Sequence, residues 1–338
     1  MPKKGYQKLK LLYILDILKK YSDEEHPLNS KDILDKLSEY SVPAERKAIY
    51  DDIAQLEAYG CDIIKTSAPK TGWFIGNREF EVPEIYLLAD AVRTAKFISA
   101  KKTRELISKL YSMLSIHQAK SREDGVYFAA TEKSGNEEIY YNIDKLNRAI
   151  IEKKQVKIEY LSRSFDQDRT IKRERKEMTI NPYALCWQDD HYYLIGNHPK
   201  YDNLIHLRLD RIALVEMTEN KARSFTEVSE YTDFFDTADY TNKLFGMYGG
   251  ELCEVELCCS KKITEQVIDR FGEDIFIKNV TEDEFNFTVK AAVSDALVTW
   301  IINYGENLKV LRPDNLREMV KQRAQSVLNA YNDGEIVI

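Results

Sequence analysis

Cysteine, proline and glycine are scarce in this chain of 338 residues, which holds 5 Cys, 8 Pro and 13 Gly. The cysteines form no CxxC pair and none has a histidine at zinc-finger spacing, so we expect no structural zinc, no disulfide framework and no cofactor. With 43% hydrophobic and 31% charged residues, the composition is that of a folded globular protein rather than a fibrous or disordered one. At this length we expect two or three domains.

Long apolar runs and enzyme motifs are also missing. No stretch approaches the roughly 18 apolar residues of a membrane span. Residues 1–21 keep Lys or Asp among their apolar positions, unlike a signal peptide, so we expect a cytoplasmic protein with no membrane partner. No GxxxxGK[ST], HExxH or GxSxG motif supports a nucleotide-processing enzyme that would use His191, His198 or His206 as acid or base, so we expect no catalysis.

The negative charge is unevenly distributed. The formal net charge is -7, but residues 219–338 alone hold 22 acidic and 13 basic side chains, which leaves residues 1–218 at +2. Basic residues cluster locally at Lys153, Lys154, Lys157, Arg163, Arg169, Lys172, Arg173, Arg175 and Lys176. Such a cluster can bind phosphate even in an acidic chain, although a solvated hairpin explains it equally well.

The first 80 residues have the element order of a winged helix. Helical spacing predicts helices over 9–21 and 31–37, the second capped by Asn29 or Ser30. A third helix is expected to open near Pro43 and to stop at Gly60. Alternating residues on both sides of a turn at 67–72 then predict a β-hairpin.

The third helix is the candidate DNA-reading element. It buries Ile49, Ile53 and Leu56 and so presents its opposite side to a major groove. The predicted DNA-binding residues are Arg46, Lys47 and Tyr50 on this helix and Lys65 and Lys70 on the hairpin. The pattern alone leaves a three-helix core without DNA binding open, because Glu45, Asp51 and Asp52 dilute the positive face.

The rest of the chain predicts two further folded parts after a helical connector. Two amphipathic helices fill 84–114, and the stretch from Gln118 to Asn136 is the expected linker. A helix at 143–151 precedes strands expected at 156–160, 176–180, 183–187, 192–196, 205–209 and 213–217. Short strands in this order suggest a small, strongly bent sheet or open barrel. From 252 onward, strands and helices alternate as in an α+β domain.

The segment NPYALCWQDDHYYLIGNHPKYDNLIHLRLDRI, residues 181–212, resembles the core of the WYL domain of bacterial transcription regulators. The naming triplet stands as Tyr192, Tyr193 and Leu194, with Tyr in place of Trp, and the RLDRI ending is intact at 208–212. Residues 44–63 and 244–272 resemble the recognition region and the C-terminal extension of these regulators.

The resemblance implies an α+β multidomain fold. Its expected parts are a winged helix-turn-helix DNA-binding domain at 1–80, a helical connector and linker at 81–138, a central WYL domain with a small Sm-like bent β-sheet or open barrel at 139–218, and an α+β extension used in dimerisation at 219–338. The implied function is a ligand-responsive, homodimeric transcriptional regulator that binds a palindromic duplex DNA operator.

The resemblance also implies a basic, aromatic WYL pocket for a single-stranded nucleic acid or nucleotide effector. The predicted ligand-binding residues are Asn181, Tyr183, Tyr193, His206, Arg208 and Arg211. Strand alternation puts His206, Arg208 and Asp210 on one face, so an ion pair between Arg208 and Asp210 competes with the ligand role. Two positions depart from the family pattern, since Asn181 replaces an expected Ser and Asp51 stands where many relatives carry Arg.

A second hypothesis is a WYL-containing protein-interaction module that does not bind DNA. Asp51 and the acidic net charge motivate it. Salt dependence distinguishes the two, because phosphate-mediated binding weakens steeply with salt and an apolar interface does not.

Overall fold

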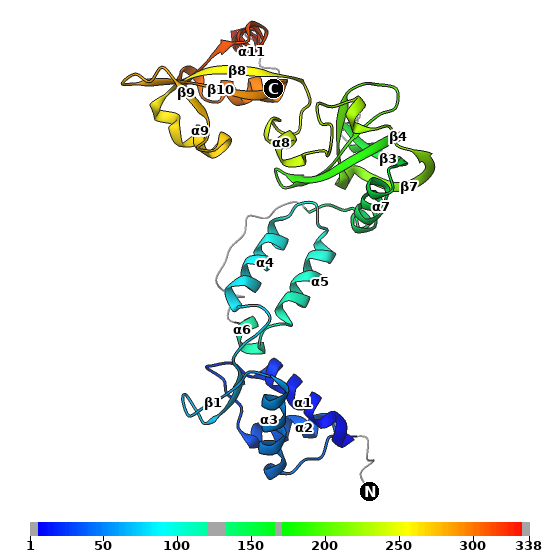
Figure 1. The fold of residues 1–338 in the computed structure, drawn as a ribbon, viewed down its shortest axis with the longest axis vertical. Helices are drawn as coiled ribbons and strands as arrows, with labels where there is room; N and C mark the ends of the chain where they lie inside the picture. The colour runs from blue at the N-terminus through cyan, green and yellow to red at the C-terminus, as the bar shows by residue number, and fades with distance from the viewer. Residues whose placement is uncertain (1–5, 121–132, 166–170, 333–338) are drawn as a thin grey trace. The chain divides into compact units, whose positions relative to one another are not determined.

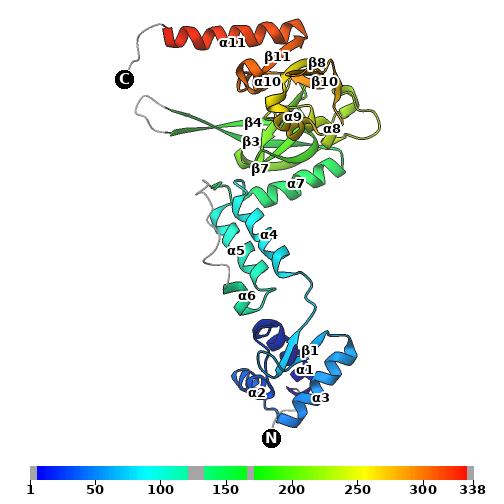
Figure 2. The ribbon, with the colours of Figure 1, turned by 90° about the vertical axis from the view of Figure 1, so that its left-hand side faces the viewer.

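The computed structural model describes residues 6–120, 133–165 and 171–332 (Figures 1 and 2). The chain divides into two compact units, Met1–Glu137 and Glu138–Ile338. Both mix helices with antiparallel strands, and none of the sheets in the described part of the chain is closed. Most of the expected linker at 118–136, and Arg169 of the basic cluster, lie outside the described residues.

The first unit opens with three helices and a hairpin, in the predicted order. They are α1 (Tyr6–Tyr21), α2 (Ser30–Glu39), α3 (Arg46–Tyr59), β1 (Ile63–Thr66) and β2 (Gly72–Ile75). Asn29 caps α2 by accepting from the backbone N–H of Lys31 and Asp32, and the Asp32 carboxylate accepts the N–H of Asn29 in return. Gly60 ends α3 at a φ of 106°, a left-handed conformation that glycine adopts without strain.

The expected start of α3 at Pro43 is wrong. The helix begins three residues later, at Arg46, and Glu45 holds the preceding extended position. The physical reason is that the chain first turns through Ser41, which has a positive φ of 57°, and Val42, whose side chain is buried in the core. Arg46 therefore lies in the first turn of α3 rather than in its second.

The core of this part is formed by one side of each helix and by the hairpin. Its buried members include Ile14, Ile17, Ile33, Leu37, Ile49, Ile53, Leu56 and Trp73. Leu28 and Trp73 form an antiparallel bridge, which adds a short third strand segment to the hairpin. Gly72 permits this approach, because a Cβ there would lie 2.7 Å from the Leu28 carbonyl oxygen.

A helical connector follows the hairpin within the same unit. It consists of α4 (Val82–Thr94), α5 (Ala100–Tyr111) and α6 (Ile116–Lys120), of which α6 was not predicted. Arg78 donates to the Met113 carbonyl over 3.1 Å and to the Ser22 carbonyl over 2.8 Å. Ser115 Oγ donates to the buried Asp23 carboxylate. These polar contacts join the connector to the loop between α1 and α2.

The second unit opens with α7 (Ile139–Ile151) and a five-stranded sheet. The strands are β3 (Lys154–Phe165), β4 (Ile171–Gln188), β5 (His191–Asn197), β6 (Leu204–Arg208) and β7 (Ile212–Lys221). Their order is β6-β5-β4-β3-β7, all antiparallel, so the sheet is open with β6 and β7 at its edges. Fully buried residues such as Val156, Ile180, Leu194 and Leu146 of α7 form its core.

Two boundaries in this sheet differ from the predicted ones. The strands expected at 176–180 and 183–187 are one continuous strand, β4. The pairing register shifts between Pro182 and Ala184, and this irregularity accommodates a proline that lacks a backbone donor. At the other boundary, β6 stops at Arg208, because Leu209–Arg211 turn into a 3-10 helix.

The C-terminal part of the second unit is α+β, as predicted from residue 252 onward. Its elements are α8 (Thr237–Asn242), β8 (Glu251–Ser260), α9 (Thr264–Phe271), β9 (Phe276–Lys278), β10 (Glu284–Val293), α10 (Asp295–Ile302), β11 (Leu308–Arg312) and α11 (Asp314–Asn332). The strands pair in the order β11-β8-β10-β9 around Val255, Leu257 and Phe287. The short elements α8 and β9 were not predicted from the sequence.

The cysteines are all free thiols, and Cys259 is buried while Cys258 beside it is partly exposed. This agrees with the opposite orientation that strand alternation predicts for adjacent residues. No helix among the described residues combines the length and hydrophobicity that a bilayer crossing requires.

Candidate functional site

The predicted DNA-binding residues lie around the first turn of α3 and the hairpin. Arg46 is exposed, and its Nε donates to Ser30 Oγ over 3.1 Å, which directs the guanidinium toward the first turn of α2. Tyr50 lies one turn further along α3 and is 45% exposed. Its ring packs edge-to-face against Trp73 of β2 at a centroid distance of 5.0 Å. The helix and the hairpin are thereby held together on the side that carries Arg46.

The two hairpin lysines face the same region. Lys65 Nζ lies 5.9 Å from the centre of the Trp73 ring, within the range of a cation–π contact. Lys70 Nζ forms an ion pair with Asp32 Oδ2 at 3.0 Å, and both side chains are partly exposed. Exposed pairs of this kind contribute about 0 to 1 kcal/mol, so Lys70 can exchange Asp32 for another anion at little cost.

A groove of about 670 Å³ brings four of the five predicted residues together. Its lining consists of Asn29, Ser30, Lys31, Leu34, Arg46, Tyr50, Lys65, Lys70, Thr71, Gly72 and Trp73. Lys47, the fifth predicted residue, is exposed on α3 but does not line the groove. Four cations and no carboxylate belong to this lining, an arrangement suited to a phosphate backbone.

Sequence reasoning missed Lys31 and Trp73 as members of the groove. Lys31 is predicted only as part of a helix, although its place in the first turn, two residues after the Asn29 cap, is a usable signal, because helix N-termini attract anions. Trp73 was assigned only to a strand. Nothing in its sequence neighbourhood indicates that its ring faces Tyr50, since this contact joins two elements that are distant in the chain.

The acidic residues of α3 lie in different environments. Asp52 is buried and pairs with Lys10 of α1, with Nζ 2.7 Å from Oδ2. It therefore stabilises the helix packing and does not face solvent. Asp51, where many relatives were expected to carry Arg, is exposed and does not line the groove.

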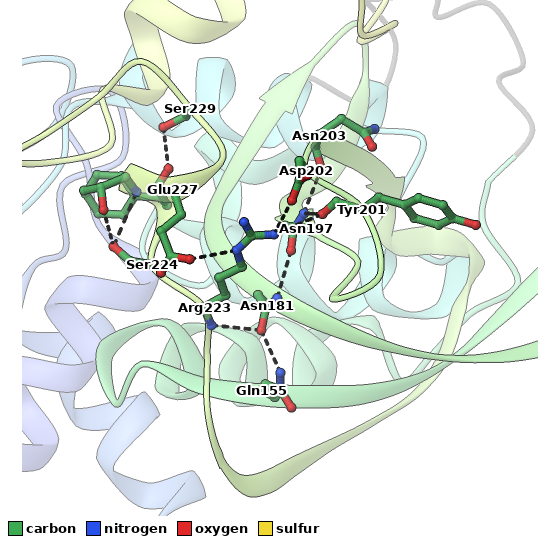
Figure 3. A network of polar contacts seen from close by, with 12 residues as sticks. Gln155, Asn181, Asn197, Tyr201, Asp202, Asn203, Arg223, Ser224, Glu227 and Ser229 are labelled. Atoms are coloured by element: carbon green, nitrogen blue, oxygen red, sulfur yellow. Dashed lines mark hydrogen bonds and ion pairs between the residues drawn. The ribbon is translucent and has the colours of Figure 1, made fainter.

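The residues predicted to bind the effector do not form one pocket. Asn181 is completely buried (Figure 3). Its Oδ1 accepts from Gln155 Nε2 at 2.9 Å and from the Arg223 backbone N–H at 3.1 Å, and its Nδ2 donates to Asn197 Oδ1 at 2.9 Å. Asn197 Nδ2 in turn donates hydrogen bonds to the carbonyls of Tyr201 and Asn203. A ligand can reach Asn181 only if this network opens.

Arg208 and Asp210 form the ion pair that the sequence analysis weighed against a ligand role. Arg208 Nε and Nη2 donate to the two Asp210 oxygens over 3.0 and 2.8 Å. The paired hydrogen bonds raise the pKa of Arg208, and they hold the pKa of Asp210 below its usual value although burial opposes its ionisation. Tyr193 lies opposite Arg208 in the register, and Arg211 is exposed beyond the pair.

His206 lies on the same strand but lines a separate cavity of about 810 Å³. Its Nε2 is 2.9 Å from the Tyr240 hydroxyl, and burial lowers its pKa to about 4, so the imidazole is neutral near pH 7. The described residues that line this cavity include Asp202, Glu230 and Glu251 but no Lys or Arg. Asp202 is paired with Arg223, and Glu230 with Lys243 and Lys290, so two of these three carboxylates are already neutralised. The lining of the cavity at His206 is thus polar and aromatic, in contrast to the basic pocket that the resemblance implies.

Tyr183 does not line the His206 cavity but packs among aromatic rings that continue toward it, because Phe235 also lies 5.3 Å from Tyr240. Its ring centroid is 6.3 Å from that of Phe225 and 6.4 Å from that of Phe235. The hydroxyl is buried without a hydrogen-bond partner among the described residues, and burial raises its pKa to about 12. Tyr231 and Tyr240 also line the His206 cavity and were not predicted, because the segment from 225 to 245 has no strand or helix pattern that points to this face.

The geometry defines a protein with a cationic groove in one unit and an open antiparallel sheet followed by an α+β part in the other. Two family models match the second unit: the WYL domain over residues 141–217 and the WCX domain over residues 251–328. The chain therefore contains a WYL domain followed by a WCX domain. Among curated proteins, none matches it significantly.

Two solved structures show a distant likeness. Proteasome accessory factor B/C (PafBC) of Arthrobacter aurescens is 15% identical with a TM-score of 0.26, over 99% of this chain and 48% of that chain. This chain thus spans about half the length of the PafBC chain. A CRISPR Cas-related protein is 13% identical with a TM-score of 0.37, over 98% of this chain and 86% of that one. TM-scores this low do not define a common fold over the whole length.

Proposed function

We propose that this protein is a DNA-binding transcriptional regulator in which α1 to β2 act as a winged helix. The groove lined by Arg46, Tyr50, Lys65 and Lys70 carries the proposal. It joins the N-terminal turn of α3 to the hairpin, the two elements with which a winged helix contacts duplex DNA. The WYL domain supports the proposal, because the family that the sequence resembles consists of transcription regulators.

The cationic groove accounts for phosphate binding in an acidic protein. DNA affinity depends on the cations that face the phosphates and on the counterions they release, not on the net charge of the chain. Arg46 and Tyr50 are one helical turn apart on α3, so both can face the same major groove, which admits an α-helix. A homodimer would place two such helices about 34 to 36 Å apart on a palindromic operator.

The regulatory part of the proposal assigns effector sensing to the WYL domain. The effector is a single-stranded nucleic acid or a nucleotide, and Arg208 with Arg211 is its anion-binding group. The bidentate pair with Asp210 keeps the Arg208 guanidinium fixed and fully charged. An effector shifts operator binding only through different affinities for two states of the protein, typically by about 1 to 3 kcal/mol.

Fluorescence anisotropy on labelled duplex DNA from upstream of the protein's own gene tests the proposal. Binding should weaken steeply as salt rises, and Arg46→Ala should reduce it. Lys101→Ala is the matched control, since Lys101 lies on α5 in an exposed ion pair with Glu137 and should leave DNA affinity unchanged. Arg208→Ala should keep DNA affinity but lose the response to added oligonucleotides. Absence of duplex binding at every salt concentration would instead favour the interaction module without DNA binding.

A further inference from the structure

The β3 and β4 strands extend beyond the sheet as a two-stranded arm. Their register is continuous over ten pairs, from Val156 and Ile180 to Phe165 and Ile171. Pairing of β3 with β7 ends at Tyr160, and pairing of β4 with β5 begins only at Asn181. The described residues 161–165 and 171–175 therefore pair only with each other, and Figure 2 shows this ribbon running past the neighbouring strands.

The two faces of the arm differ in chemistry. Strand alternation and the register place Leu161, Arg163, Phe165, Ile171 and Arg175 on one face, named here the arginine face. Closer to the sheet, the same face carries Glu159 and Glu177, which lie opposite each other in the register. The part of the face without carboxylates therefore starts at Leu161. The opposite face carries Ser162, Ser164, Lys172 and Glu174.

The arginine face is exposed at Arg163, Phe165, Ile171 and Arg175, and half-buried at Leu161. The exposed fraction is 79% for Phe165 and 58% for Ile171, and Arg163 is exposed beside them. Arg175 makes a 3.1 Å ion pair with Glu159, but its side chain is 70% exposed. A pair this exposed contributes about 0 to 1 kcal/mol, so Arg175 remains able to bind another anion.

An isolated two-stranded ribbon is marginally stable in water, and exposed apolar side chains beside arginines indicate a contact surface. We propose that the arginine face binds along a groove of duplex DNA, as a contact separate from the α3 groove and independent of it. The partner is an anion by charge complementarity, since the face joins Arg163 and Arg175 to the exposed Phe165 and Ile171 and holds no carboxylate between 161 and 165 or between 171 and 175.

The dimensions favour a duplex. The major groove is about 12 Å wide and admits a two-stranded β-ribbon. Residues that share a face of a strand repeat every 7 Å or so, because each residue rises by about 3.4 Å. Arg163 and Arg175 lie one row apart on the arm, so both guanidinium groups are close enough together to bind phosphates that border the same groove. Phe165 and Ile171 can then contact sugars and thymine methyl groups.

The test compares salt dependence of DNA binding for charge-matched variants of the full chain. Arg163→Gln with Arg175→Gln removes two cations from the arginine face, and Lys172→Gln with Lys176→Gln removes two exposed cations from the opposite face. Each phosphate contact contributes about 0.9 to the slope of log K against log salt, so the arginine variant should lower the slope by about 2. The lysine variant should lower it by less than half of that.

A melting temperature close to that of the wild type shows that each variant is folded. An unchanged slope in the arginine variant overturns the proposal, and so does an equal loss in the lysine variant, which would indicate general electrostatics. If the wild type binds one strand of this DNA alone more tightly than the duplex, and the arginine variant loses that binding, the assignment to duplex DNA is overturned.

The same series in an Arg46→Ala background separates this inference from the proposed function. If only Arg46→Ala weakens binding, the α3 groove is the DNA contact and the arm is not. If only the arginine variant weakens it, the arm binds DNA and the winged-helix proposal fails.

Discussion

Acid is expected to destabilise the second unit through His206. Burial lowers the pKa of this imidazole from 6.5 to about 4. Its Nε2 lies 2.9 Å from the Tyr240 hydroxyl, which holds the ring inside the cavity between β6 and the segment that follows β7. Between pH 6.5 and 4 the unfolded chain binds a proton that the folded chain does not, so the free energy of unfolding falls as the pH falls.

The size of the effect follows from the two pKa values. The full difference corresponds to about 3 kcal/mol, reached only below the folded-state pKa of about 4. At pH 5 the folded imidazole is still mostly neutral, and linkage gives a loss of about 2 kcal/mol relative to pH 7. This is a large part of the total stability of a typical domain, which is about 5 to 15 kcal/mol.

Urea unfolding of the wild type and of His206→Gln at the two pH values measures this contribution. Glutamine does not titrate, so the wild type should lose about 2 kcal/mol more than the variant between pH 7 and pH 5. His198→Gln is the control, because His198 lies in the loop after β5 and does not line the His206 cavity. Equal pH dependence in the wild type and in His206→Gln would refute the reasoning.

Three further substitutions test contacts inside each unit. Asn181→Ala leaves the donors and the acceptor around it unpaired and should cost about 3 kcal/mol in urea unfolding; a wild-type midpoint would show that the network contributes little. Asp52→Ala leaves Lys10 without its 2.7 Å partner and should cost about 3 kcal/mol, whereas an unshifted melting temperature would contradict the ion pair. Gly72→Ala places a methyl group against the Leu28 carbonyl, so both stability and duplex affinity should fall; hydrogen exchange of the Leu28 amide reports the bridge directly, and unchanged protection would count against it.

Local signals predicted the elements of the first unit well. Asn29 caps α2 and Gly60 ends α3 because these positions depend on side chains and dihedral angles within a few residues. The exposed side of α3 was also predictable from helical spacing, and Arg46 and Tyr50, which lie on it, line the groove. The start of α3 was not predictable in this way. The chain before the helix turns so that Val42 is buried, and this burial depends on the rest of the core.

The predicted effector site shows where sequence periodicity fails. Alternation correctly relates His206 to Arg208 along one strand, but it does not report what packs over each residue. Tyr240, from a segment more than 30 residues away, covers His206, while Arg208 stands at the end of β6 and pairs with Asp210 in the next turn. Burial of Asn181 likewise depends on Asn197 and Arg223, contacts that only the tertiary fold creates.

The contacts of Arg78 and Asp23 define the cooperativity of the first unit. Burial opposes ionisation of Asp23, but hydrogen bonds from Ser115 and His26 outweigh it and hold the pKa of Asp23 below its usual value. Arg78 donates hydrogen bonds to the carbonyl of Met113 in the connector and to that of Ser22 in the loop between α1 and α2. Detaching the connector would remove Ser115 from the Asp23 carboxylate and the Met113 carbonyl from the Arg78 guanidinium, so each charged group would lose one of its hydrogen-bond partners. Residues 6–120 are therefore expected to melt in one transition, and a truncation after the hairpin would remove part of the free energy that keeps the α3 groove folded.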